Sequence, residues 1–224
     1  MGCCGISVVD VLDPEAPEHD VAALLSIHLR QFPDYKHVVQ EIADLRRAPK
    51  HDGLRHAWLL KLGAQAIGEV LFHSVPQRGV VLMHFVVIEE EHRKQLPLGW
   101  FAHLIDTIGL TAESDLRDAG SQAKAIIAEV DKVATSRWER AGFVVLPIDY
   151  LEPHHGMHWR EHGEPTFFPM TPVLRPIRVP ESTHLGELAV LAVSAFLLDH
   201  YALEADHPNV VTALYQAREL GQDI

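Results

Sequence analysis

Two basic residues, Arg93 and Lys94, lie in a stretch of sequence that could bind an anion. They follow an apolar run, Val80 to Ile88, whose β-branched and aromatic residues predict a buried strand. Gly99 comes next and opens a helical pattern of apolar residues. Amides at the N-terminus of a helix attract negative charge, and two fixed positive charges would add to that attraction. The stretch therefore predicts a loop that holds a pyrophosphate.

Several polar residues in or near predicted strands could move a proton. Glu69 and His84 interrupt apolar strand patterns, and Glu129 ends another. A polar residue in a buried strand needs a partner, and acids with shifted pKa values cluster at catalytic sites. The alternative is a hydrogen-bonded core histidine or an ordinary glutamate at a strand end. Tyr150 is a candidate acid by residue type only, and a tyrosine with a hydrated hydroxyl is its alternative.

A group of four histidines lies within the nine residues 154–162, shortly after Tyr150. On a helix, three of them would share one face because they are spaced by four, and imidazoles suit zinc or nickel. Gly156 and Gly163 favour a loop instead, and the 16 histidines of the chain are spread along its length. We therefore predict a loop without a metal. The group consists of His154, His155, His158 and His162.

The elements that would position these residues occur in a mixed order. An antiparallel first half that leads into a strand–helix–strand second half indicates an α+β sheet. The turn at Leu62–Gln65 suggests a hairpin. The predicted strands cover residues 6–11, 56–62, 66–75 and 80–88, and the predicted helices cover 20–32, 35–47 and 99–119. Residues 125–150 are expected to form a strand, a short helix and a second strand.

The composition changes after Tyr150. Residues 166–178 are β-prone but contain three prolines, which is typical of an edge strand. Two apolar helical patterns, 185–201 and 209–220, would need to pack on the main domain or on a second subunit, so a homodimer is possible. We predict a first domain over 1–179 and a helical extension over 180–224.

Composition limits the partners and the compartment. The net charge of −12 over 224 residues argues against nucleic acid, because no basic surface dominates. No apolar run approaches the length of a membrane span. The only cysteines, Cys3 and Cys4, are adjacent and rarely bridge without strain, so a reducing cytoplasm is expected.

Two motifs together resemble the GNAT acetyltransferase superfamily over about residues 5–178. They are the loop HRKQLPLG (His92–Gly99) and the segment RWERAGF (Arg137–Phe143). The resemblance implies a mixed, mostly antiparallel sheet flanked by helices, with acetyl-CoA entering where two central strands splay apart. It also implies direct acetyl transfer to an amine. The cofactor-binding residues that it implies are Val86, Val87, Ile88, Arg93, Lys94, Gln95, Leu98, Gly99 and Trp138.

The sequence departs from the family pattern in two places. Leu96, Pro97 and Leu98 stand where small residues are expected, and a proline lacks the amide that a phosphate would use. Trp138 stands where a tyrosine often protonates the leaving thiolate, and an indole is no acid at neutral pH. Two hypotheses therefore remain open: an N-acetyltransferase for a small or peptidyl amine, and a non-catalytic module that binds acyl-CoA or a protein.

Overall fold

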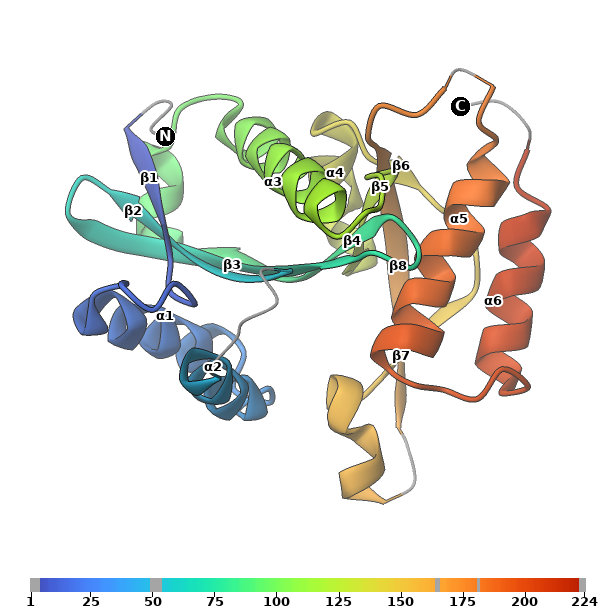
Figure 1. The fold of residues 1–224 in the computed structure, drawn as a ribbon, viewed down its shortest axis with the longest axis horizontal. Coiled ribbons are helices and arrows are strands. Elements are labelled where there is room, and N and C mark those ends of the chain that lie inside the picture. The colour runs from blue at the N-terminus through green and yellow to red at the C-terminus, as the bar shows by residue number, and fades with distance from the viewer. Residues whose placement is uncertain (1–4, 49–53, 164–165, 181, 222–224) are drawn as a thin grey trace. The chain divides into compact units, whose positions relative to one another are not determined.

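The computed structural model describes residues 5–48, 54–163, 166–180 and 182–221 (Figure 1). Its first elements are β1 (Ile6–Asp10), α1 (Glu18–Gln31), α2 (His37–Arg47), β2 (Arg55–Leu62), β3 (Gln65–Val75), β4 (Val80–Ile88), the 3₁₀ helix η1 (Glu90–Gln95) and α3 (Trp100–Asp118). The later ones are β5 (Ala125–Val130), η2 (Lys132–Ala134), α4 (Thr135–Arg140), β6 (Val144–Val145), β7 (Tyr150–Pro153), η3 (Gly156–His162), β8 (Phe167–Pro176), α5 (Leu185–Ser194), the π-helix η4 (Ala195–His200) and α6 (Pro208–Arg218).

The strands form a mixed sheet in the order β1-β2-β3-β4-β5-β8-β6, with β7 paired to β8. The pairings of β2 with β1 and β3, and of β8 with β5, β6 and β7, are all antiparallel. Helices flank the sheet (Figure 1). The predicted α+β class is therefore confirmed.

The chain divides into two compact units, and the division falls within β3, β4 and α3. Unit 1 holds residues 1–73 and 83–104, and unit 2 holds residues 74–82 and 105–224. The predicted boundary between residues 179 and 180, and the possible homodimer, stay predictions.

In unit 1, two helices cover one face of the antiparallel strands. Strands β2 and β3 pair through a turn at Gly63, whose φ of 62° suits glycine, so the predicted hairpin is confirmed. Leu24 and Ile27 of α1 and Ile42 of α2 are buried in one core with Leu59 of β2. Their spacing of three to four residues along each helix makes that face apolar.

Gly68 of β3 lies close against β4 within unit 1. A Cβ atom added to this glycine would lie 2.2 Å from the carbonyl oxygen of Val87 and 2.7 Å from the side chain of Ile88. No side chain fits at that separation, so the local packing of the two strands requires glycine.

In unit 2, the strands and the C-terminal helices share one core. The amide of Lys124 donates to the carbonyl of Gly79 at 2.7 Å, so the chain enters β4 and β5 at the same end. Ile127 of β5 and Leu174 of β8 are fully buried in the same cluster as Phe196 of η4. The α5–η4–α6 segment is therefore part of the core of unit 2.

The prediction of an edge strand over residues 166–178 is wrong. Leu174 of β8 pairs with Ile127 of β5 and also with Val144 of β6, so β8 has neighbours on both sides. Prolines are tolerated there because a proline lacks only the amide donor. Its carbonyl still accepts, as that of Pro172 does from the amide of Leu146 at 3.0 Å.

Within the described part of the chain, no helix combines the length and the apolar character that a membrane span requires. The predicted cytoplasmic location stays a prediction.

Candidate active site

A carboxylate at the end of β5 accepts two hydrogen bonds from phenol groups in unit 2. The hydroxyl of Tyr150 donates to Oε1 of Glu129, and the hydroxyl of Tyr201 donates to Oε2. Both tyrosines are buried, and Glu129 is half-buried. Two residues chosen from the sequence, Glu129 and Tyr150, are thus brought into direct contact.

Strand β8 holds the first pair in register. Glu129 on β5 lies opposite Pro172 of β8, and Tyr150 on β7 lies opposite Met170 of the same strand. A β-sheet keeps paired strands at a fixed spacing of about 5 Å. The separation of the carboxylate from the first phenol is therefore set by backbone pairing.

Tyr201 reaches Glu129 from the other direction, at the end of the π-helix η4. Its amide donates to the carbonyl of Phe196 at 2.8 Å, a bond over five residues that belongs to the π-helical turn. Its own carbonyl accepts from the indole Nε1 of Trp159 at 2.8 Å. Sequence reasoning missed Tyr201. The only signal was a lone tyrosine at the end of a strongly apolar helix.

The surroundings of Glu129 raise its pKa well above the ordinary value of 4.5. Removal from water is the main cause, and the negative charge of Glu152 adds to it, while the two phenol hydrogen bonds act in the opposite direction. Burial and the charge of Glu129 also raise the pKa values of Tyr150 and Tyr201, so both phenols stay protonated donors at neutral pH. A carboxylate tuned in this way accepts a proton more readily than an ordinary glutamate.

Glu69 belongs to a separate buried pair in unit 1. Nδ1 of His28 lies 2.8 Å from Oε1 of Glu69, and both side chains are fully buried. Nε2 of His28 lies 3.2 Å from the carbonyl of Tyr35. Burial raises the pKa of Glu69, which the bond to His28 partly offsets, and Oε2 has no hydrogen-bond partner among the described residues. The pair joins α1 to β3 inside the core.

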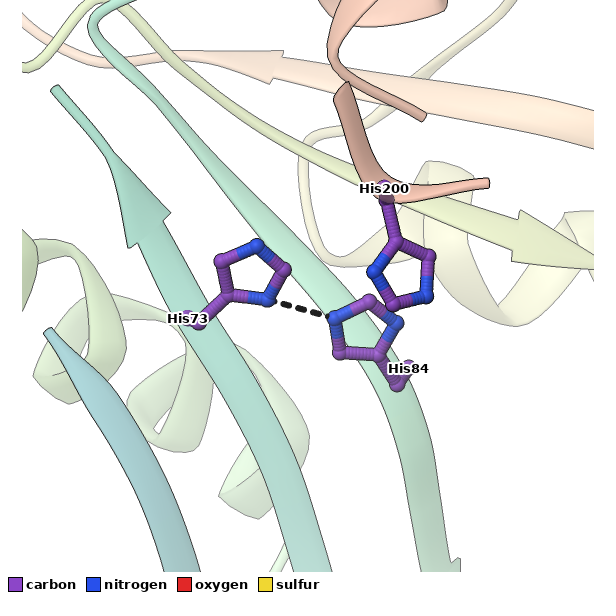
Figure 2. Close-up of side chains that lie close together, drawn as sticks. All are labelled: His73, His84 and His200. Carbon is purple, nitrogen blue, oxygen red and sulfur yellow. Dashed lines mark hydrogen bonds between the residues drawn. The ribbon is translucent and has the colours of Figure 1, made fainter. Parts of the chain in front are cut away.

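His84 also has a partner within unit 1. Its Nε2 lies 2.7 Å from Nδ1 of His73 on the neighbouring strand (Figure 2). The rings stack with an interplanar angle of 10°. One proton must lie between these two nitrogens, because two unprotonated imidazole nitrogens cannot form a hydrogen bond. The structure thus places Glu69 and His84 in unit 1 and the Glu129 group in unit 2.

The predicted phosphate loop lies at the surface of unit 1. Arg93, Lys94 and Gln95 are exposed on η1, and Nε of Arg93 donates to the carbonyl of Ile88 at 3.0 Å. Gly99 has a φ of 79°.

Other predicted cofactor residues vary in burial. Leu98 is completely exposed, whereas Ile88 is buried and Val86 and Val87 are half-buried. Trp138 of α4 in unit 2 is only 5% exposed and meets the ring of Phe143 edge to face, with 4.8 Å between ring centroids.

The histidine group after Tyr150 has local partners. His154 stacks on His155, with 3.9 Å between ring centroids, and Nδ1 of His158 lies 2.8 Å from a carboxylate oxygen of Glu161. These three histidines bring no three ligand atoms together among the side chains that the structure describes. The side chain of His162 lies outside that description. Residues 156–162 form a 3₁₀ helix where a loop was predicted.

No protein-family model and no curated protein sequence matches this chain. Solved structures do match it. A protein described as a GNAT-family acetyltransferase from Bacteroides thetaiotaomicron is 13% identical with a TM-score of 0.55, and the match covers 89% of this chain and 99% of that one. A second so described, from Desulfovibrio desulfuricans, is 14% identical with a TM-score of 0.52 over 77% and 99% of the two chains. Ard1 from Thermoplasma volcanium is 12% identical with a TM-score of 0.50 over 78% and 99%.

Each of these matches covers at least 77% of this chain and nearly all of the other. At such low identity they establish the fold and leave the chemistry to be argued from the site. The resemblance seen in the loop and in RWERAGF is confirmed at this level: the chain has the fold of the GNAT acetyltransferases.

Proposed function

We propose that this protein transfers an acetyl group from acetyl-CoA to an amine, with Glu129 as the general base. The observation that carries the proposal is the Glu129 carboxylate, which accepts from Tyr150 and Tyr201 and has a strongly raised pKa. A carboxylate with a raised pKa is a stronger base than an ordinary glutamate, which suits an amine that must lose a proton before it attacks. The fold supports the same reaction, since similar structures are described as acetyltransferases.

The proposed step balances without a metal or a redox partner. Glu129 accepts one proton from the ammonium group, which is otherwise charged at neutral pH. The nitrogen lone pair forms the new C–N bond at the thioester carbonyl, the C–S bond breaks with its electron pair on sulfur, and the nitrogen then loses its second proton to solvent. A thiol pKa near that of free cysteine, about 8.5, allows the thiolate to take a proton from solvent at neutral pH. Tyr150 holds the base in place.

We further propose that the loop from Arg93 to Gly99 binds the pyrophosphate of acetyl-CoA. Two exposed cations favour an anion, and so does the N-terminal end of α3, although the amides of Trp100 and His103 already donate to the carbonyls of Pro97 and Gly99. Gly99 has no neighbouring atom within 4 Å of an added Cβ, so a phosphate has room beside its backbone. Pro97 offers no amide, which leaves the two cations as the main source of affinity.

Replacing both Arg93 and Lys94 by alanine should weaken CoA binding at least tenfold, because charge-assisted bonds to phosphate contribute about 1.5–3 kcal/mol each. Isothermal titration calorimetry with CoA measures the change. A matched double variant, Lys36→Ala with Arg47→Ala, removes two exposed cations elsewhere in unit 1 and should bind normally. If the two double variants bound CoA with equal affinity, the loop from Arg93 to Gly99 would not be the pyrophosphate site.

Trp138→Phe should keep most of the activity, because the buried indole packs on Phe143 and its weak donor cannot supply a proton to a thiolate. Thiol release from acetyl-CoA with an active amine, measured from pH 6 to 9, checks this. If Trp138→Phe lost turnover a hundredfold while its CoA affinity and melting temperature stayed unchanged, the indole would take part in catalysis and this prediction would be wrong.

A non-catalytic module is the second candidate, and the loop favours it in one respect. Leu96, Pro97 and Leu98 stand where the family pattern expects small residues, and Pro97 lacks the amide that a phosphate would use. A panel of small and peptidyl amines separates the two functions. CoA binding without thiol release from acetyl-CoA for any amine of the panel would support the module.

A further inference from the structure

The C-terminal segment supplies one of the two hydrogen bonds to the proposed base. Tyr201 lies 72 residues after Glu129 in the chain, beyond all strands of the sheet. It is 2% exposed, and its neighbours fix it from several sides. Trp159 donates to its carbonyl, the π-helical turn holds its amide, and Phe196 stacks on its ring with 5.9 Å between centroids. A phenol held at three points has little freedom to leave its acceptor.

We propose that Tyr201 is a positioning residue for Glu129, so that the C-terminal helices are a working part of the acetyl-transfer site. The role of Tyr201 in catalysis rests on the proposed function. Its effect on the orientation and the pKa of the Glu129 carboxylate does not. Tyr150 alone would hold one oxygen, and the terminal torsion of a glutamate has a broad, roughly two-fold preference. A second donor on the other oxygen fixes the plane of the carboxylate and the direction of its remaining lone pairs.

The charged and titratable groups that face Glu129 determine how its pKa should change when the Tyr201 hydroxyl is removed. They are Tyr150 and Glu152 on β7 and Tyr201 after η4. Glu152 repels the charged carboxylate, and each phenol stabilises it. Removing the Tyr201 hydroxyl leaves the repulsion and the burial in place and takes away one stabilising bond. The pKa of Glu129 should therefore rise further.

Tyr201→Phe in the full chain tests the proposal, since it keeps the ring and removes only the hydroxyl. The acid limb of the kcat/KM profile should move up by about one pH unit, because a hydrogen bond to a charged group corresponds to a shift of that size. At pH values on the acid limb, kcat/KM of the variant should be about tenfold lower than that of the wild type. The KM for acetyl-CoA should stay within about twofold of the wild-type value. Tyr215→Phe, on an exposed tyrosine of α6, is the matched control and should shift nothing.

A second measurement does not depend on activity. Carbon-13 NMR of proteins labelled at the glutamate carboxyls follows the titration of Glu129, whose signal is the one missing in Glu129→Gln. Its midpoint should rise in Tyr201→Phe. It should also rise, by a smaller amount, in Trp159→Phe, which loses the donor to the Tyr201 carbonyl.

The outcomes separate the two claims. An unchanged midpoint in a folded Tyr201→Phe variant, judged by its melting curve, overturns the positioning role whatever the activity. A raised midpoint in a protein that acetylates none of the tested amines supports the positioning contact and counts against the proposed function. If Tyr201→Phe does not fold, an unchanged midpoint in folded Trp159→Phe overturns the proposal instead.

Discussion

Replacing Glu129 by glutamine should lower kcat about 10²–10⁴-fold, which is the usual contribution of a positioned general base. Glutamine has nearly the same shape and can still meet both phenols, but it cannot accept the proton of the amine. Steady-state thiol release at saturating acetyl-CoA measures the loss. The affinity for CoA should stay within about twofold, because the group removed acts on the acceptor amine.

The control for this variant is Glu139→Gln, which removes one negative charge from an exposed glutamate of α4 and should keep full turnover. A Glu129→Gln enzyme that keeps wild-type turnover across the pH range would show that another group deprotonates the amine.

Stability gives a check that is independent of catalysis. The folded-state pKa of Glu129 is raised, so the folded protein binds its proton more tightly than the unfolded chain does. That stabilisation is complete below the unfolded pKa and is lost as the pH rises through the folded pKa. Relative to Glu129→Gln, the wild type should therefore lose melting temperature in that interval as the pH increases.

Ending the chain at Pro180 should leave a protein that aggregates or melts at a much lower temperature. The removed helices supply fully buried residues, among them Leu188, Phe196 and Val210, to the same cluster as Ile127 and Leu174 of the sheet. Without them, a large apolar face of unit 2 would be exposed to water. Size-exclusion chromatography and thermal melting of the shortened chain measure the result.

A point substitution tests the same interface without shortening the chain. Phe196→Ala should cost about 3–5 kcal/mol, a large share of the roughly 5–15 kcal/mol that stabilises a typical protein. Tyr215→Ala, on the exposed face of α6, should change stability by less than about 0.5 kcal/mol. A shortened chain that stays soluble and equally stable, together with a harmless Phe196→Ala, would show that the C-terminal helices are dispensable for folding.

The sequence predicts those elements whose residues carry a local pattern. Residues 80–88 form a strand with the predicted bounds, because β-branched and aromatic residues fill it and turn residues limit it on both sides. The helix expected from Gly99 to Ala119 is shorter by one residue at each end, since Gly99 and Ala119 flank it. Glu129 can be selected from the sequence because it is a polar group at the end of an apolar strand, whereas Tyr150 is a candidate by residue type only.

Features set by tertiary packing could not be predicted in this way. The three prolines of β8 suggest an edge strand, but β6 pairs with Val173 and Leu174 on the side away from β5 and gives this part of β8 a second neighbour. The contact of Tyr201 with Glu129 joins residues far apart in the chain and leaves no periodic trace. The buried pair of His28 and Glu69 has the same origin. A single sequence records what each residue prefers locally and not which distant residue it meets.

Because a π-helical turn precedes Tyr201, the position of its hydroxyl depends on the number of residues in that turn as well as on their identity. Residues 195–200 contain the wider turn, and each residue of a helix rotates the chain by about 100°. Deleting one codon within this turn would favour ordinary α-helical bonding and redirect residue 201 away from Glu129. An in-frame deletion at this place would therefore remove the second phenol as effectively as a mutation of Tyr201, whereas apolar exchanges that keep the length would preserve it. During divergence of such a chain, the number of residues in this turn should change more slowly than their identity.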